Sequence, residues 1–218
     1  MECNNVYDAI IISDLHLGSR VCQRGKLLRF LNDIYFGKIK TKFLIVNGDF
    51  LDSPKGLDSV LFALLTKHFD TVLIRGNHDG HQSKLHGVEV NSGWCLLSGD
   101  KRIFIFHGDF VDEFIRRHPF ITWLAEKGYD LLQQLNLKWA YWLKHYSKTL
   151  IHCSEQIEKE ARFIIGKRYD MVCCGHTHFA KASDDGIYFN SGCWTEPHCH
   201  YLTVKDGKIE LHEYIDSH

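Results

Sequence analysis

The feature that most constrains this chain is a set of five short apolar runs that each stop at Asp, Asn or His beside a glycine. Residues 7–12, 43–46, 71–74, 102–106 and 171–174 form these runs. Their length and β-branched content are typical of buried strands. In open α/β sheets, ligands bind outside the carboxyl ends of the strands. The pattern therefore predicts an α/β fold in which five polar strand ends converge on one site.

The rest of the chain supports this class. Apolar residues recur at helical spacing in residues 22–36, and residues 57–69 are also predicted to be helical. Residues 187–190, 200–204 and 208–214 are predicted as short strands, the last two joined by the Asp206-Gly207 turn. The pattern of residues 88–98 fits neither a helix nor a strand clearly. Because no stretch has the composition of a linker, residues 1–218 are expected to form a single domain.

A long segment between the fourth and fifth strand ends differs from the rest. Residues 110–169 are apolar, helical in pattern and rich in Phe, Tyr and Trp. Between residues 116 and 148 there are six basic and two acidic residues, a local charge of +4 in a chain of net charge −1. We expect a helical insert that forms a cap. The alternative is an ordinary helical subdomain whose aromatic residues form a buried core.

Composition excludes several functions. With 26 basic and 27 acidic residues, a generally basic nucleic-acid-binding protein is not expected. No apolar run approaches the roughly 18 residues of a membrane span, and the first residues lack the features of a signal peptide. Eight cysteines without a C-x-x-C pair indicate mostly free thiols in a reducing compartment. The chain is therefore predicted to be cytoplasmic.

The polar strand ends contain the residue types that bind metal ions. They are Asp14, His16, Asp49, Asn77, His78, Asp79, His107, Asp109, His176 and His178. Carboxylates, imidazoles and an amide together suit Mn, Fe, Zn or Co better than an all-oxygen Mg or Ca site. There are enough ligands for two cations with one bridging carboxylate, and such a pair can clamp a phosphoryl group during hydrolysis. We expect two divalent cations, with Mn the first choice and Fe or Zn as alternatives.

The five blocks, in this order, resemble the signature of the calcineurin-like metallophosphoesterases. That resemblance implies a sandwich of two mixed β-sheets flanked by helices, with the helical insert as a cap. It also implies that Asp14, His16, Asp49 and His178 hold one metal, and that Asp49, Asn77, His107 and His176 hold the other. His78 would then be the catalytic acid or transition-state stabiliser, and Asp79 would orient it.

Within the family the chain is similar to the UDP-2,3-diacylglucosamine diphosphatases. The similar features are the opening Ser13-Asp14-Leu15-His16-Leu17-Gly18, the position of the insert, and residues 190–196 before the last hairpin. The resemblance implies hydrolysis of a pyrophosphate bond in an amphiphilic substrate at a membrane surface. Residues expected to bind that substrate are Arg20, Arg116, Arg117, Trp123, Trp139 and Trp142, with Lys138 and Lys144 meeting anionic head groups. One block departs from that branch, because His78 stands where well-known members carry Arg.

Two other functions stay open. One is a soluble nucleotide or cyclic-nucleotide phosphodiesterase with the same metals, and the other is a non-catalytic, phosphoesterase-like binding module. Some single residues also have two readings. Asp52 could support a ligand or cap a helix, Arg20 could be a plain surface residue, and His198 with His200 could share one face of a strand. The oligomeric state is left open.

Overall fold

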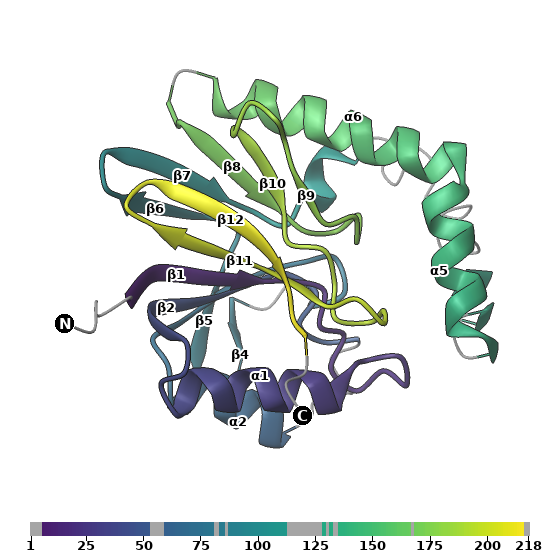
Figure 1. Ribbon diagram of the computed structural model, residues 1–218, viewed down its shortest axis with the longest axis horizontal. Coiled ribbons are helices and arrows are strands. Elements are labelled where there is room, and N and C mark those ends of the chain that lie inside the picture. Colours follow the sequence, from purple (N-terminus) through teal and green to yellow (C-terminus); the bar gives the residue numbers. More distant parts are fainter. Residues whose placement is uncertain are drawn as a thin grey trace.

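The computed structural model describes residues 6–52, 59–80, 83–85, 87–112, 128–129, 131–132, 135–166 and 168–215. Its described strands form two mixed sheets that lie face to face (Figure 1). The larger sheet has the order β12-β11-β1-β2-β3-β5-β4, and the smaller has the order β6-β7-β8-β10-β9. The predicted sandwich of two mixed β-sheets flanked by helices is confirmed.

The larger sheet has a parallel centre. It consists of β1 (Val6–Ile12), β2 (Lys40–Asn47), β3 (Thr71–Ile74), β4 (Lys84–Leu85), β5 (Val88–Asn91), β11 (His200–Lys205) and β12 (Lys208–Glu213). β1, β2, β3 and β5 pair in parallel, whereas β4, β11 and β12 are antiparallel to their neighbours. The carboxyl ends of β1, β2 and β3 therefore meet at one edge.

The smaller sheet supplies the remaining strand ends. It consists of β6 (Trp94–Ser98), β7 (Lys101–Ile105), β8 (Met171–Cys174), β9 (Lys181–Ala182) and β10 (Tyr188–Asn190). β7, β8 and β10 run parallel to one another. The segment that was ambiguous in sequence, residues 88–98, forms β5 and β6, one strand in each sheet. Such short strands are hard to classify by periodicity alone.

One apolar cluster lies between the two sheets, and one further cluster lies on the outer face of each sheet. Along β1, Ala9 and Ile11 face the second sheet, and Ile10 and Ile12 pack in the cluster under α1 (Arg24–Tyr35) and α2 (Ser59–Lys67). Both faces of β1 are buried, which explains why it has a continuous apolar run instead of alternation. α1 and α2 lie on the outer face of the larger sheet, as Figure 1 shows.

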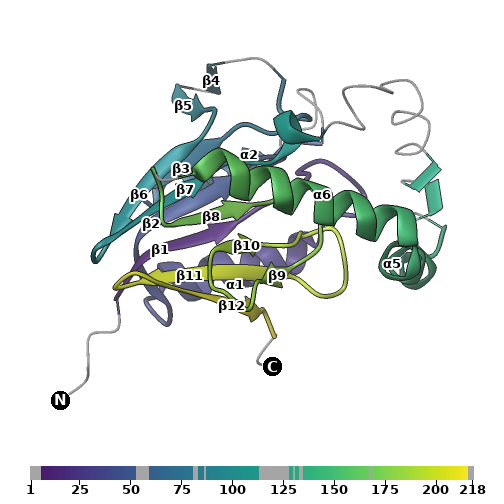
Figure 2. The same ribbon diagram turned by 90° about the horizontal axis from the view of Figure 1, so that it is seen from above.

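The described part of the insert is helical. A short 3-10 turn, η1 (Asp109–Val111), follows β7, and two helices, α5 (Leu137–Tyr146) and α6 (Lys148–Ile165), precede β8. α6 buries Ala161 and Ile165 on the outer face of the smaller sheet. The two helices are joined at Ser147, whose side chain caps the start of α6. Figures 1 and 2 show that α5 turns away from the axis of α6 at the side of the molecule to which β1 points.

Candidate metal centre

Four strand ends bring predicted ligands together, and β3 leads into Asn77 and His78 beside them. β1 leads into Asp14 and His16, and β2 leads into Asp49. β7 is followed by His107, and the loop after β8 contains His176 and His178. Two backbone hydrogen bonds, from Asp14 N to Gly48 O (3.1 Å) and from His16 N to Asp49 O (2.9 Å), hold the first two loops side by side.

The ligand atoms fall into two adjacent groups. Asp14, His16 and His178 form one group. Asp49, His107 and His176 form the other, and in each group the atoms lie within 4.8 Å of one another. Asp49 Oδ2 lies 3.2 Å from His107 Nε2 and 3.9 Å from His16 Nε2. Asp49 therefore stands between the groups, where a bridging ligand would be.

The backbone of this cluster is strained. Among the described residues other than glycine, only six have positive φ. Five of them are candidate ligands: Asp14 (52°), His16 (46°), Asp49 (48°), His176 (66°) and His178 (59°). The left-handed region is uncommon for residues with a side chain, and strain of this kind gathers at functional sites. Tight, left-handed turns let several side chains point at one small volume.

Glycines make room for these side chains. A Cβ added at Gly76 would collide with the carboxylate and the backbone of Asp49, and one at Gly48 would collide with the ring of His107. A Cβ on Gly175 would lie 2.7 Å from Asp14 Oδ2. The glycines recognised in the sequence as turn formers therefore also allow close approach of the ligands.

Unpaired polar atoms show that the cluster fits a cation. Asp14 Oδ1, His16 Nε2 and His107 Nε2 are buried and make no hydrogen bond of normal geometry with any described residue, although Asp14 Oδ1 and His107 Nε2 each lie within ion-pair distance of an opposite group. Buried polar atoms without a partner are rare and costly. Asp14 Oδ1 is 3.1 Å from His178 Nε2. Two ligands of one ion, each at about 2.0–2.2 Å, lie roughly 3–3.5 Å apart. The donor set and its spacing therefore suit divalent metal ions.

The electrostatics agree with this assignment. Burial by itself would raise the pKa of Asp14 and of Asp49, but the surrounding imidazoles outweigh it and lower both values. Burial would lower the pKa of His107, but Asp49 and Asp14 raise it to about 10. The carboxylates thus hold a proton on His107. A metal ion would displace that proton, because it binds neutral histidine.

His78 lies beside the cluster, where its ring forms a group within 4.8 Å with His16 and Asp52, and not with Asp14 or Asp49. Its ring centroid is 4.7 Å from that of His16, and its backbone N–H donates to Asp49 Oδ1 (2.9 Å). Its Nδ1 lies 3.3 Å from the carbonyl oxygen of Asp52. The half-buried imidazole is therefore placed to meet a group bound at the metals.

Asp79 departs from the predicted role. Its two carboxylate oxygens accept from the backbone N–H groups of Leu51 (3.0 Å) and Gly76 (2.8 Å), so it ties two loops together instead of orienting the ring of His78. Burial and the neighbouring Asp49 raise the pKa of Asp79 to about 7. The sequence places Asp79 next to His78, but the turn directs its side chain into the protein.

A family model described as calcineurin-like phosphoesterase matches residues 8–180, well over half of the chain. The chain belongs to this family. The family is consistent with metal-dependent phosphoester hydrolysis, and the strand-end cluster supplies the candidate metal-binding groups. No curated protein sequence matches the chain significantly.

Solved structures show the same fold at low sequence identity. Vacuolar protein sorting 29 from Cryptosporidium parvum is 13% identical, with a TM-score of 0.50, over 95% of this chain and 97% of that one. A novel archaeal phosphodiesterase is 14% identical, with a TM-score of 0.50, over 94% of this chain and 99% of that one. Identities this low show a shared architecture and say nothing about the substrate.

The remaining predicted residues are exposed to solvent or lie outside the described residues. Asn77 and Arg20 are both exposed. Trp139 and Trp142 on α5 are 64% and 53% exposed. Arg116, Arg117 and Trp123 lie outside the described residues. Their assignment to the substrate stays a prediction.

The phosphoesterase centre also includes residues that sequence reasoning missed. Asp112, at the end of η1, places Oδ2 3.1 Å from His176 Nε2. Cys193 and Glu196 form a further group with His178, again within 4.8 Å. These residues come from loops outside the five motif blocks. The one available signal was that residues 190–196 resemble the corresponding ending in the diphosphatase branch.

Lys144 contradicts the role predicted for it. Its side chain is only 5% exposed, and its Nζ lies 2.5 Å from Glu196 Oε1. A buried, paired ammonium is not available to bind a lipid head group. The helical period explains the difference, because Lys144 lies one turn after the buried Ala140 on the inward face of α5.

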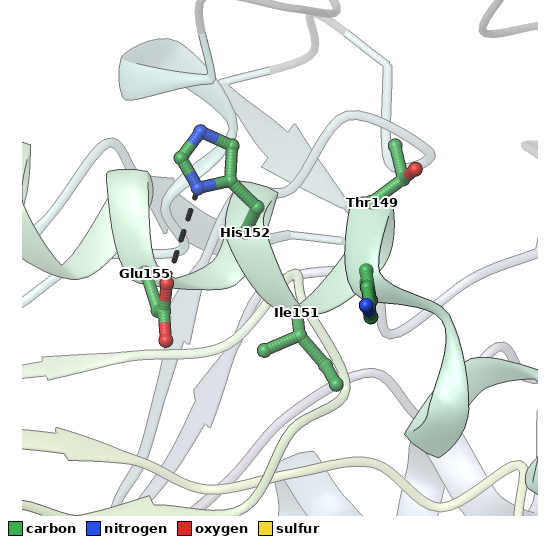
Figure 3. Close-up of a pocket in the computed structure, with 5 residues that line it drawn as sticks. Thr149, Ile151, His152 and Glu155 are labelled. Atoms are coloured by element: carbon green, nitrogen blue, oxygen red, sulfur yellow. Dashed lines mark ion pairs between the residues drawn. The ribbon is translucent and has the colours of Figure 1, made fainter.

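A separate hollow lies along the first turns of α6 (Figure 3). It is lined by Lys148, Thr149, Ile151, His152 and Glu155, all from one helix. His152 Nδ1 and Glu155 Oε2 are 3.9 Å apart, and both side chains are about two-thirds exposed at 67% and 65%. Binding sites gather polar groups from several elements in a concave pocket. This hollow has no such convergence, and it does not share residues with the metal centre.

Proposed function

We propose that this chain is a dinuclear metal-dependent phosphoesterase that hydrolyses a pyrophosphate or phosphodiester bond in an amphiphilic substrate, with UDP-2,3-diacylglucosamine or a related lipid-linked diphosphate as the first candidate. The observation that most supports the reaction is the pair of adjacent ligand groups with Asp49 between them. Five strained backbones and three unpaired buried atoms are hard to explain without cations.

In this proposal each residue has a defined task. Asp14, His16 and His178 hold one cation, and His107 and His176, with Asn77, hold the other. Asp49 binds both. Two such cations activate water and neutralise the charge on the phosphoryl oxygens during in-line displacement. Mn²⁺ is the first choice, and Fe or Zn also suits these ligands.

His78 supplies the remaining chemistry. Its ring reaches the same volume as His16, and its own backbone is held by the Asp49 carboxylate. It can donate a proton or a hydrogen bond to the leaving-group oxygen as the bond to phosphorus breaks. Asp79 contributes indirectly, because it holds the Gly76 turn against Leu51.

The amphiphilic substrate is supported by α5. Its outward face exposes Trp139, Trp142, Leu143 and Tyr146. The rings of Trp142 and Tyr146 are stacked at 5.1 Å, and those of Trp139 and Trp142 are 6.3 Å apart. A contiguous exposed apolar patch marks an interaction surface. Amphipathic faces that combine aromatic and basic residues, here with the exposed Lys138, suit a membrane interface.

We place the protein in the cytoplasm, in peripheral contact with the membrane. Among the described residues, no helix is long and apolar enough to cross a bilayer. A stretch of α5 lying at the interface would reach a lipid substrate without crossing the membrane. We propose no nucleic-acid partner, given a net charge of −1.

One assay series separates the proposal from its alternatives. The Mn²⁺-loaded protein is tested on a chromogenic phosphodiester, a diacylated sugar nucleotide diphosphate, its deacylated form and a cyclic nucleotide. Preference in kcat/KM for the diacylated compound over the deacylated one supports the proposal. Equal values, or preference for the cyclic nucleotide, favour a soluble phosphodiesterase. No turnover of any substrate by a protein that binds two Mn²⁺ would favour a binding module.

A further inference from the structure

A buried lysine joins the insert to the metal centre. Lys144 is the one lysine among the described residues whose residue surface is almost completely buried, at 4% exposed. Its Nζ donates to Glu196 Oε1 (2.5 Å) and to the carbonyl oxygen of His178 (2.8 Å), and lies 4.8 Å from the centroid of the Phe179 ring. One ammonium therefore fixes α5, the loop after β8 and the loop after β10.

Glu196 is the centre of this contact. It is 3% exposed and accepts from Lys144 and, at 3.4 Å, from the hydroxyl of Tyr129. His145 Nε2 lies 3.9 Å from its other oxygen. Glu196 also forms a close group with His178 and Cys193. The carboxylate thus stands between α5 and a ligand of the metal centre.

Stability alone does not explain such a pair. Taking a lysine and a glutamate out of water costs as much as their attraction returns, and apolar replacements are often neutral. The contact has a geometric consequence, however. His178 has φ of +59°, an uncommon conformation that needs support from its surroundings. Lys144 supplies it by holding the His178 carbonyl, and this leaves the imidazole 3.1 Å from Asp14.

The side chain of His178 is supported as well. Metal-binding imidazoles are usually oriented through a partner of the ring on the side away from the ion. His178 faces Asp14 through Nε2, and besides Asp14 and His16 its ring has Cys193 and Glu196 as ligand-type neighbours among the described residues. Both the backbone and the ring of His178 therefore depend on the segment to which Lys144 is tied.

We infer that Lys144 and Glu196 are positioning residues that hold His178 as a ligand, so that the seating of α5 controls occupancy of the Asp14–His16–His178 site and leaves the Asp49–His107–His176 site intact. This inference rests on the proposed two-metal function. It adds that the two metal positions differ in what supports them. The Asp14–His16–His178 site depends on the insert, and the Asp49–His107–His176 site depends on the sheets.

The experiment measures metal binding instead of turnover. The metal-free protein is titrated with Mn²⁺, and the bound ions are followed by electron paramagnetic resonance, which separates a coupled pair from a single ion. The test variant is Lys144→Met combined with Glu196→Gln, which leaves no uncompensated buried charge. His178→Ala and His176→Ala serve as references for loss of the first and of the second ion. Lys138→Met, an exposed lysine on the same helix, is the matched control.

We expect two Mn²⁺ in the wild type and in Lys138→Met. The double variant should bind one of the two ions roughly 10–100-fold more weakly, the size typical of lost outer support. Its spectrum should then match that of His178→Ala. Glu196→Gln alone keeps an acceptor for Lys144 and should shift the same ion by a smaller factor.

The outcomes are distinct. Wild-type affinity for both ions in a folded double variant overturns the inference while the proposed function stands. A spectrum that matches His176→Ala overturns it as well. If the double variant does not fold, Glu196→Gln decides, and unchanged affinity for both ions in that variant is then the contrary result. A wild-type chain that binds no Mn²⁺ overturns the proposed function, and this inference with it.

Discussion

The strand-end cluster and helix α5 differ in which of their side chains are buried and which are exposed. At the cluster, Asp14, Asp49 and His107 are almost fully buried, yet buried atoms there lack partners and the backbone is strained. On α5 the backbone is regular, while Trp139 and Trp142 face solvent. In the cluster, buried polar atoms lack normal hydrogen bonds. On α5, large apolar side chains are exposed to solvent. Each unmet requirement points to a missing partner, a cation in one case and an apolar molecule in the other.

This comparison predicts that substitutions in the cluster lower activity more than substitutions on α5. Replacing Asp49 with Ala removes the one carboxylate that lies between His16 and His107. Both cations lose a ligand, so we expect metal content and turnover to fall to background. Elemental analysis and a phosphodiester assay measure these two quantities. Near-normal turnover would contradict the two-metal assignment.

His78→Ala tests whether chemistry and metal binding separate within the cluster. The His78 ring contacts the ring of His16 at 4.7 Å, and it groups with His16 and Asp52 and not with Asp14 or Asp49. Both ions should therefore stay bound, while the rate falls roughly 10²–10⁴-fold, as for a positioned acid or charge stabiliser. Elemental analysis beside the rate checks this. If the variant loses a metal ion, His78 is a ligand.

Gly76→Ala tests the close packing of the cluster. Gly76 has no positive φ, so alanine is compatible with its backbone angle, but the new methyl group would collide with the carboxylate and the backbone nitrogen of Asp49. A displacement of about 1 Å at a catalytic group costs roughly 10²-fold in rate. The measurement is kcat at saturating Mn²⁺. Gly128→Ala, whose methyl group would meet none of the described residues within 4 Å, is the control and should keep full activity.

The cluster was largely predictable from sequence and α5 was not. Each ligand follows its strand by only a few residues, and parallel strands bring their carboxyl ends together whatever the rest of the fold does. Asp14, Asp49 and His107 therefore needed no tertiary information. The same reasoning placed β1 and β8 within a residue of their ends and found the helical character of α5 and α6.

Other features depended on contacts between distant segments. Lys144 and Glu196 are 52 positions apart in sequence and meet only because α5 packs against the loop after β10. Asp112 reaches His176 across 64 positions. Asp79 was misjudged because adjacency to His78 says nothing of where a turn directs a side chain. Residues 88–98 were ambiguous since two short strands were read as one segment.

The acid stability of the metal-free protein tests the link between the two regions. Burial would raise the pKa of Glu196, but His145, Lys144 and His178 outweigh it and lower the pKa to about 2, from 4.5 in the unfolded chain. A lowered folded-state pKa stabilises the protein above the unfolded value and loses that effect as pH falls towards 2. About 2.5 units correspond to roughly 3 kcal/mol of unfolding free energy.

Urea unfolding between pH 6 and pH 3 measures this contribution. The free energy of unfolding of the wild type should fall between pH 6 and pH 3. In Glu196→Gln, whose amide does not titrate, it should fall less over the same range. Glu155→Gln is the control, because Glu155 is exposed on α6. Equal slopes in the wild type and in Glu196→Gln would show that Glu196 is not held ionised by Lys144.

The smallest effect is expected at the exposed face of α5. Replacing Trp139 and Trp142 with Ser removes side chains that are 64% and 53% exposed, so the free energy of unfolding should change by about 0.5 kcal/mol or less for each. Metal content and turnover of a deacylated sugar nucleotide should not change. With the diacylated form, kcat/KM should fall roughly tenfold, because the burial of about two methylenes at about 0.8 kcal/mol each is lost. The ratio of the two kcat/KM values is the measurement. If the ratio is the same in the variant and in the wild type, the exposed face of α5 does not bind acyl chains. In that case α5 is an ordinary solvent-exposed helix beside the metal centre.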